Sequence, residues 1–153
     1  EVKSSVGVLA ANGCRDITVL HCVSAYPAPP DECNLSAIET MCSKIKIPEP
    51  EIEIHFGWSD HSISDAVISR AVHRWGATMI EFHLDLDKKG KEFKMGHCWL
   101  PNQIERVIKN VDMGFSADGN GIKEPTKSEM IERDWRADPE DGLRPLKVIR
   151  DKL

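Results

Sequence analysis

The sequence predicts an α/β protein with parallel strands, arranged as the C-terminal part of a (β/α)8 barrel. Strand-like and helix-like stretches alternate three times along the chain of 153 residues, which is the pattern of right-handed βαβ crossovers. Polar residues gather where the predicted strands end, as they do in barrel enzymes. Three βα units cannot close a barrel, and the chain opens with a helix that would belong to an earlier unit. We therefore expect an incomplete barrel, with an open three-layer sheet as the alternative.

The first half of the chain supplies one complete βα unit. Residues 4–12 have the pattern of a helix end and precede a glycine, which commonly ends helices. The apolar, β-branched run 16–24 predicts a buried strand. Three prolines make 25–32 a loop, because proline removes a backbone donor and fixes its dihedral angle. Apolar residues at helical spacing predict a helix over 34–45, with Asn34 as its N-cap.

Two further units follow. Alternating residues predict a strand over 51–59, and one apolar face at helical spacing predicts a helix over 62–77. The run 78–86 predicts the third strand. Residues 100–115 predict another helix, with a proline in its first turn. We assign 1–115 to the partial barrel and 116–153 to a helical or irregular tail.

Composition excludes several classes of protein. Hydrophobic residues make up 41% and charged residues 29% of the chain, which is typical of a globular protein. The net charge of −5 gives no indication of a nucleic-acid surface. No apolar stretch approaches the roughly 18 residues of a membrane span, and the first residues lack the pattern of a signal peptide. We expect a cytoplasmic protein, processed or truncated upstream because Glu1 replaces an initiator methionine.

The five cysteines are odd in number and share no CxxC spacing. This pattern favours reduced thiols over a disulfide framework or a structural zinc site. They are Cys14, Cys22, Cys33, Cys42 and Cys98.

Histidine-bearing polar clusters follow all three predicted strands. Parallel strands bring their carboxyl ends to one edge of a sheet, where active sites of such folds lie. Two imidazoles on neighbouring strand ends, His61 and His83, suit a divalent metal ion. A single histidine at such a place is more often a structural hydrogen-bonding group. The clusters comprise His21, Cys22 and Ser24, then Ser59, Asp60 and His61, then Glu81 and His83.

Three motifs resemble those of the N-acetylneuraminate (sialic acid) synthase family. They are "HCVSAYPAPPDECNL", "GWSDHS" and "GATMIEFHLDLD". The corresponding family segments run close to "HCxSxYPxPxxxxNL", "GxSDHT" and "GAxxIEKHFTLD". The resemblance covers roughly residues 4–115, with the motifs in the family's order and at its intervals. A weaker resemblance joins "ADPEDGLRP" to the tail of some members.

The resemblance implies an enzyme that condenses phosphoenolpyruvate with an N-acylated amino-sugar aldehyde, giving a nonulosonic acid and phosphate. It implies a divalent metal ion, typically Mn²⁺ with Mg²⁺ or Co²⁺ as alternatives, held by His61 and His83. It places Ser24 and Ser59 at the phosphoenolpyruvate and Tyr26 beside the sugar pocket.

Two carboxylates, Asp60 and Glu81, are candidates to orient a histidine or a water molecule. The alternative for each is a buried carboxylate paired with a lysine or an amide.

The chain also departs from the family. Where members carry a "GPDH" segment that contacts the sugar, this sequence has "KKGKEFKMGHCWLP". His97 is therefore either a candidate sugar contact or a surface residue, and a different acceptor is expected. The family's C-terminal antifreeze-like domain, which supplies an arginine to the partner's site, has no counterpart here. Arg144 is a candidate replacement, although a solvated tail arginine is the simpler interpretation.

Two classes of function follow. The first is a sugar acid synthase that works with the missing N-terminal half of the barrel, or as a homodimer. The second is a non-catalytic half-barrel that self-associates to cover its strand edges. Another metal-dependent barrel enzyme is a further alternative.

Overall fold

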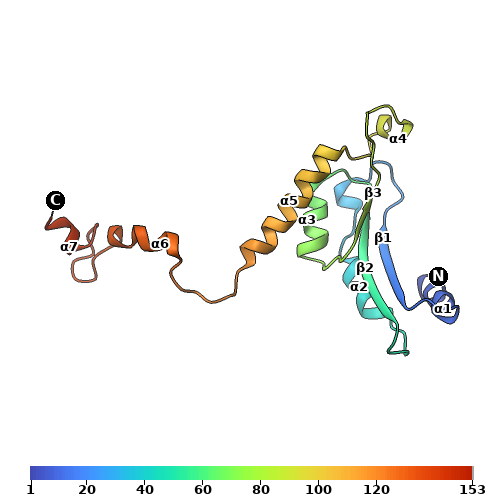
Figure 1. Ribbon diagram of the computed structural model, residues 1–153, viewed down its shortest axis with the longest axis horizontal. Coiled ribbons are helices and arrows are strands. Elements are labelled where there is room, and N and C mark those ends of the chain that lie inside the picture. Colours follow the sequence, from blue (N-terminus) through green and yellow to red (C-terminus); the bar gives the residue numbers. More distant parts are fainter. Residues whose placement is uncertain (153) are drawn as a thin grey trace. The chain divides into compact units, whose positions relative to one another are not determined.

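The computed structural model describes residues 1–152, in two compact units (Figure 1). The first unit, Glu1–Asp118, contains the sheet, and the second begins at Gly119. In chain order the first unit comprises α1 (Val2–Ala11), β1 (Asp16–Cys22), a short 3-10 helix (Pro30–Glu32), α2 (Ala37–Lys44), β2 (Glu53–Asp60), α3 (Asp65–His73), β3 (Ile80–Phe82), α4 (Lys91–Lys94) and α5 (Pro101–Asp118).

The sheet has three strands in the order β1-β2-β3, and both pairings are parallel. Helices α2 and α3 connect the strands and α5 follows the third, so the predicted succession of βα units is confirmed. The sheet is open within the described residues, because β1 and β3 each pair with β2 and with no other strand. The architecture is a partial barrel, as the sequence predicted.

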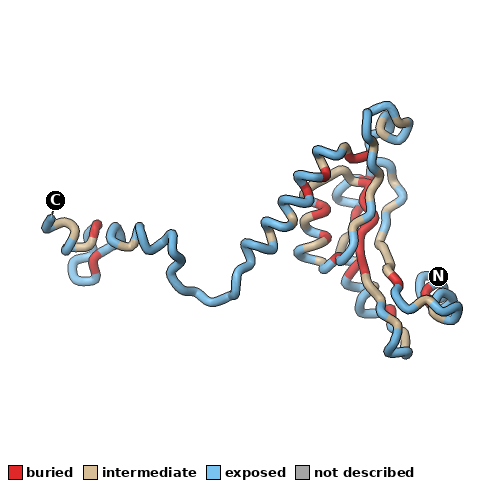
Figure 2. The backbone as a smooth tube through the Cα atoms, viewed as in Figure 1, coloured by how far each residue is buried: buried red, intermediate tan, exposed pale blue. Residues whose placement is uncertain are grey.

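The hydrophobic core lies between β2 and the helices beside it. Trp58 and Phe56 on β2 pack in one cluster with Ile38 of α2 and with Val67 and Ala71 of α3. Figure 2 shows these buried segments in red, concentrated along β2 and the facing sides of the helices. A smaller cluster joins α3 to α5 through Ile68, Trp99, Ile104 and Val107.

The third strand is shorter than the predicted 78–86. After Phe82 the chain pairs with the returning segment around Trp99: the Trp99 amide donates to the His83 carbonyl at 2.8 Å, and the Asp85 amide donates to the Trp99 carbonyl at 2.9 Å. This pairing closes the loop that carries α4. It brings the residues just before Trp99 back to the end of β3.

Helix α2 also begins later than predicted. Its N-cap is Ser36, and Asn34 lies two residues earlier with a φ of 44°. Asparagine tolerates this left-handed conformation better than most residues. Asn34 therefore belongs to the turn before the helix, and its prediction as the N-cap was wrong.

The second unit contains α6 (Lys127–Glu132), a 3-10 helix (Arg133–Trp135) and α7 (Lys147–Arg150). Thr126 and Glu129 form a reciprocal capping box at the start of α6. The buried Asp138 carboxylate accepts hydrogen bonds from the backbone amides of Glu140 at 2.9 Å and Lys147 at 2.7 Å. Among the described residues, no helix has the length and apolar character that a membrane crossing requires.

Candidate functional site

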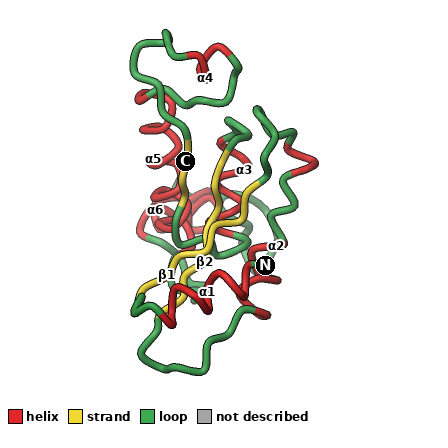
Figure 3. Tube along the Cα trace, turned by 90° about the vertical axis from the view of Figure 1, so that its right-hand side faces the viewer, coloured by secondary structure: helices red, strands yellow, loops and turns green. Residues whose placement is uncertain are grey.

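The carboxyl ends of the three strands lie at one edge of the sheet. The register pairs Cys22 of β1 with Ser59 of β2, and Asp60 of β2 with Phe82 of β3. His61 and His83 each directly follow one of two neighbouring strands. The loop that carries α4 extends beyond the strands (Figure 3).

His61 is buried and held in one tautomer. Its Nδ1 lies 2.9 Å from the carbonyl oxygen of Val23, in the segment after β1. Since a carbonyl can only accept, Nδ1 carries the proton and donates it. In the neutral ring the lone pair is then on Nε2, which is the form of imidazole that binds a metal ion.

His83 is oriented by a carboxylate. Its Nδ1 lies 2.9 Å from Oε2 of Glu92 at α4, and this hydrogen bond lowers the pKa of Glu92. The ionised carboxylate accepts from Nδ1–H, and in a neutral His83 ring this arrangement puts the lone pair on Nε2. A carboxylate behind a histidine is the usual support for a metal-binding imidazole.

The rings of the two histidines lie beside each other and beside an aromatic ring. The ring centres of His61 and His83 lie 5.1 Å apart, and the Tyr26 ring centre lies 4.3 Å from that of His61. Tyr26 is also exposed, with 45% of its surface accessible. The structure therefore brings together Tyr26, His61 and His83, which the sequence analysis named.

His97 joins this group from the loop after α4. Its ring centre lies 5.1 Å from that of His83 and 4.9 Å from that of Tyr26. The side chain is 2% exposed, and its Nδ1 is buried without a hydrogen-bond partner among the described residues. Burial lowers the pKa of His97, and the nearby His83 lowers it further, so the neutral imidazole is favoured.

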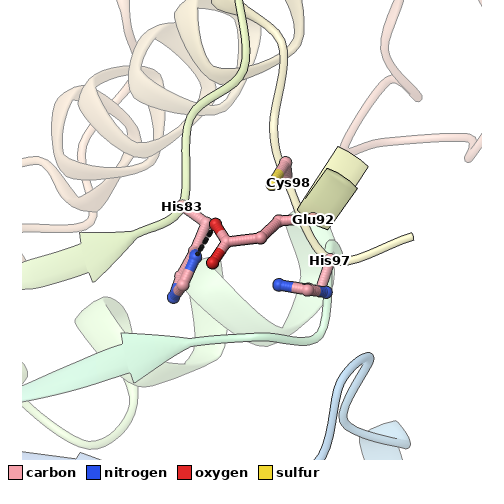
Figure 4. Close-up of side chains that lie close together, drawn as sticks. All are labelled: His83, Glu92, His97 and Cys98. Carbon is pink, nitrogen blue, oxygen red and sulfur yellow. Dashed lines mark hydrogen bonds and ion pairs between the residues drawn. The ribbon is translucent and has the colours of Figure 1, made fainter. Parts of the chain in front are cut away.

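Four side chains in this region lie close enough together to hold a metal ion: His83, Glu92, His97 and Cys98. Their ligand atoms all lie within 4.8 Å of one another, and the four side chains converge in Figure 4. Burial raises the pKa of the Cys98 thiol, with the carboxylates of Glu92 and Asp85 adding to the effect. The thiol therefore stays protonated unless a cation displaces the proton.

The sequence did not predict Glu92 or Cys98 as site residues. Glu92 lies in a charged stretch that has the pattern of a solvated loop, and no spacing rule links it to a histidine nine positions earlier. Cys98 had one signal, its place directly after His97. Both reach the site because the pairing around Trp99 closes the loop.

The serine predicted at phosphoenolpyruvate on β2 contacts a carboxylate. Ser59 Oγ donates to Glu81 Oε2 on the neighbouring strand at 2.6 Å, and the register places the two residues directly opposite each other. Ser24 is exposed in the segment that follows β1. These hydroxyl and carboxylate groups offer donors and acceptors to a polar ligand.

Asp60 points to the other side of the sheet from Ser59. It is fully buried, and its carboxylate accepts from the indole Nε1 of Trp58 and of Trp99, each at 2.9 Å. The Ser62 hydroxyl donates to it at 2.6 Å. Each of these partners belongs to the core or to the turn after β2, and none is a histidine or a site serine.

Arg144 lies in the second unit, where its side chain is exposed. Arg144 stays a sequence-based candidate.

Known proteins resemble the chain over most of its length. A protein of Methanocaldococcus jannaschii is 37% identical over 131 residues, which is 84% of this chain and 36% of that protein. The N,N'-diacetyllegionaminic acid synthase of Campylobacter jejuni is 34% identical over 133 residues, covering 84% of this chain and 37% of the relative. The chain therefore spans about a third of the length of these curated relatives.

A solved structure also resembles the chain over most of its length. The N-acetylneuraminic acid (sialic acid) synthetase of Leptospira borgpetersenii, determined in complex with citrate, superimposes with a TM-score of 0.64 at 30% identity. The match covers 86% of this chain and 43% of that structure. Residues 1–123 match the NeuB family. With the three parallel strands and the order of their motifs, this match shows that the chain belongs to the NeuB family.

Proposed function

We propose that this chain forms part of a nonulosonic acid synthase, which condenses phosphoenolpyruvate with an N-acylated amino-sugar aldehyde and releases phosphate. The observation that carries the proposal is the pair His61 and His83. Each has its Nδ1 engaged by a hydrogen-bond acceptor, which leaves Nε2 of the neutral ring available to a metal ion, at neighbouring strand ends of a NeuB-family chain. The names of the relatives point to the same class of product.

The residues present fit a divalent metal ion. His61 and His83 would hold it through Nε2, with Val23 and Glu92 fixing the two rings from behind. Mn²⁺ is the ion we expect, with Mg²⁺ or Co²⁺ as alternatives. A bound ion would supply Lewis-acid polarisation of the acceptor's aldehyde carbonyl.

Serine hydroxyls would hold the phosphoenolpyruvate. Ser59 and Ser24 lie at the ends of β2 and β1 and can donate to its phosphate or carboxylate oxygens. Ser59 would exchange its present acceptor, Glu81, for the ligand. The freed Glu81 carboxylate can then orient a water molecule and accept its proton.

The reaction balances with these groups. C3 of the enolpyruvate bonds to the aldehyde carbon, and the aldehyde oxygen becomes a hydroxyl with the proton that the attacking water gives up through Glu81. Water adds at C2, and the C2–O bond to phosphate breaks to give the keto acid and free phosphate. Tyr26, which packs against His61 with part of its ring exposed, would line the pocket of the acceptor sugar. Because the chain spans about a third of its relatives, we propose that further barrel strands, from a longer chain or a partner, complete the site.

The test measures phosphate release from phosphoenolpyruvate with an N-acyl mannosamine-type sugar and Mn²⁺, together with the mass of the product. The chain is assayed alone and after addition of the remaining barrel segment of the Campylobacter relative. We expect the condensation product, its loss in His61→Ala and His83→Ala, and its retention in His55→Ala, a histidine on β2 outside the site.

Phosphate release without a condensed product would indicate a hydrolase and contradict the proposal. Absence of product from a folded chain in both mixtures would favour the non-catalytic half-barrel.

A further inference from the structure

Three imidazoles, those of His61, His83 and His97, meet at the strand ends. The ring centres of His97 and His83 are 5.1 Å apart, the same separation as between His61 and His83. The ring centres of His61 and His97 are 6.5 Å apart. Two imidazoles that share one metal ion at about 2.1 Å per bond bring their ring centres to roughly 5 Å. Two of the three pairs already have this spacing, whereas the rings of His61 and His97 lie farther apart and must move closer to share an ion.

His97 is held at this place without hydrogen bonds from its ring to the described residues. It is 2% exposed, and its buried Nδ1 has no partner there. No hydrogen bond joins any two of the three imidazoles within residues 1–152. In Figure 4 one ring nitrogen of His97 points toward His83 and Glu92. A buried ring nitrogen without a hydrogen-bond partner can be satisfied by a bound cation.

We propose that His97 is a third protein ligand of the metal ion held by His61 and His83. This inference rests on the proposed function, because it extends the pair of histidines named there. It replaces the sugar contact expected for His97 from the sequence. Three imidazoles form a nitrogen-rich site, which favours Zn²⁺ or Co²⁺ strongly over Mg²⁺ and leaves an open position for a substrate oxygen.

Glu92 and Cys98 compete with this assignment, because they lie near His83 and His97. The Glu92 carboxylate is already bonded to Nδ1 of His83, which is the place of a supporting group behind a ligand. Binding through the four residues of that cluster would leave His61 out. The two ligand sets therefore differ in their dependence on His61 and Cys98.

Titration with Co²⁺, followed by visible absorption and calorimetry on the 153-residue chain, separates the two sets. We expect His97→Phe, which keeps a ring but offers no ligand atom, to weaken Co²⁺ binding by at least about tenfold. His61→Ala should weaken it similarly. Cys98→Ser should leave both the affinity and the spectrum unchanged, as should the matched control His55→Ala.

A second measurement needs no variant. X-ray absorption of the Zn²⁺-loaded wild-type chain counts the imidazoles around the ion, and we expect three. Circular dichroism of each variant checks that it is folded before its titration is interpreted.

Three outcomes overturn the inference: two imidazoles at the zinc, an unchanged Co²⁺ affinity in folded His97→Phe, or a cobalt–thiolate absorption band that Cys98→Ser abolishes. If His97→Phe binds normally while His61→Ala and His83→Ala do not, His97 is not a ligand and the metal pair of the proposed function stands. Failure of the proposed function itself would appear in the condensation assay, with metal binding intact.

Discussion

The carboxylate of Asp60 ties the end of β2 to two tryptophans. Trp58 and Trp99 donate their indole N–H groups to its two oxygens, and the turn after β2 donates through Ser62. The next residue is His61. The hydrogen bonds of Asp60 therefore hold the backbone beside His61 in place. At the scale of single residues, Asp60 therefore positions His61. It does so through hydrogen bonds that it accepts on the side of the sheet opposite Ser59.

Replacing Asp60 tests this positioning role. Asp60→Ala leaves two buried indole donors without acceptors, and we expect it to lower the free energy of unfolding by roughly 2–4 kcal/mol. Urea denaturation followed by tryptophan fluorescence measures the change. Asp16→Ala, which removes an exposed carboxylate at the start of β1, should change stability by less than about 0.5 kcal/mol. Equal small effects in the two variants would show that the indole bonds do not hold the strand end.

The site residues that the sequence could identify are those governed by a simple rule. His61 and His83 follow neighbouring parallel strands, so alternation along the chain was enough to predict that they meet. The hydrogen bond from His83 to Glu92 crosses a nine-residue loop, and no periodicity determines how such a loop closes. The position of Glu92 follows instead from the tertiary pairing of Trp99 with residues 83–85.

At the scale of elements, β2 is contacted very closely by the backbone of Met79, just before β3. A Cβ built at Gly57 would collide with the carbonyl oxygen of Met79 and would lie 2.7 Å from Cδ2 of Leu20. The same Met79 carbonyl accepts the amide of Trp58 at 3.0 Å. Glycine at this position lets β2 meet the segment that leads into β3. The sequence could predict the strand. It could not predict which residues contact Gly57, because those contacts form only when the sheet folds.

Substitution of Gly57 tests this close contact. We expect Gly57→Ala to destabilise the chain by roughly 1–3 kcal/mol, because the added methyl group must displace backbone. The matched control is Gly7→Ala in α1, where a Cβ would meet no atom within 4 Å. Alanine is the better helix former, so the control should raise stability by up to about 1 kcal/mol. Thermal melts that rank Gly57→Ala at or above the wild type would contradict the packing described for β2.

At the scale of the whole molecule, the described chain is a three-stranded part of a barrel. Strands β1 and β3 each have one partner within residues 1–152, so each leaves an edge that a neighbouring strand can pair with. The chain covers about a third of its curated relatives, which agrees with a barrel completed by further strands. The succession of strands and helices was predictable because parallel βα units follow strong periodic rules. The loop of α4 and the second unit follow no such repeat.

The central claim is that the ends of β2 and β3 form a metal site through His61 and His83. Equilibrium binding of Mn²⁺, followed by electron paramagnetic resonance, tests it without requiring the rest of the barrel. We predict that the chain binds a single Mn²⁺ ion, that His61→Ala and His83→Ala each abolish this binding, and that His55→Ala retains it. Undiminished Mn²⁺ binding in folded His61→Ala and His83→Ala, or no binding by the wild-type chain, would contradict the claim.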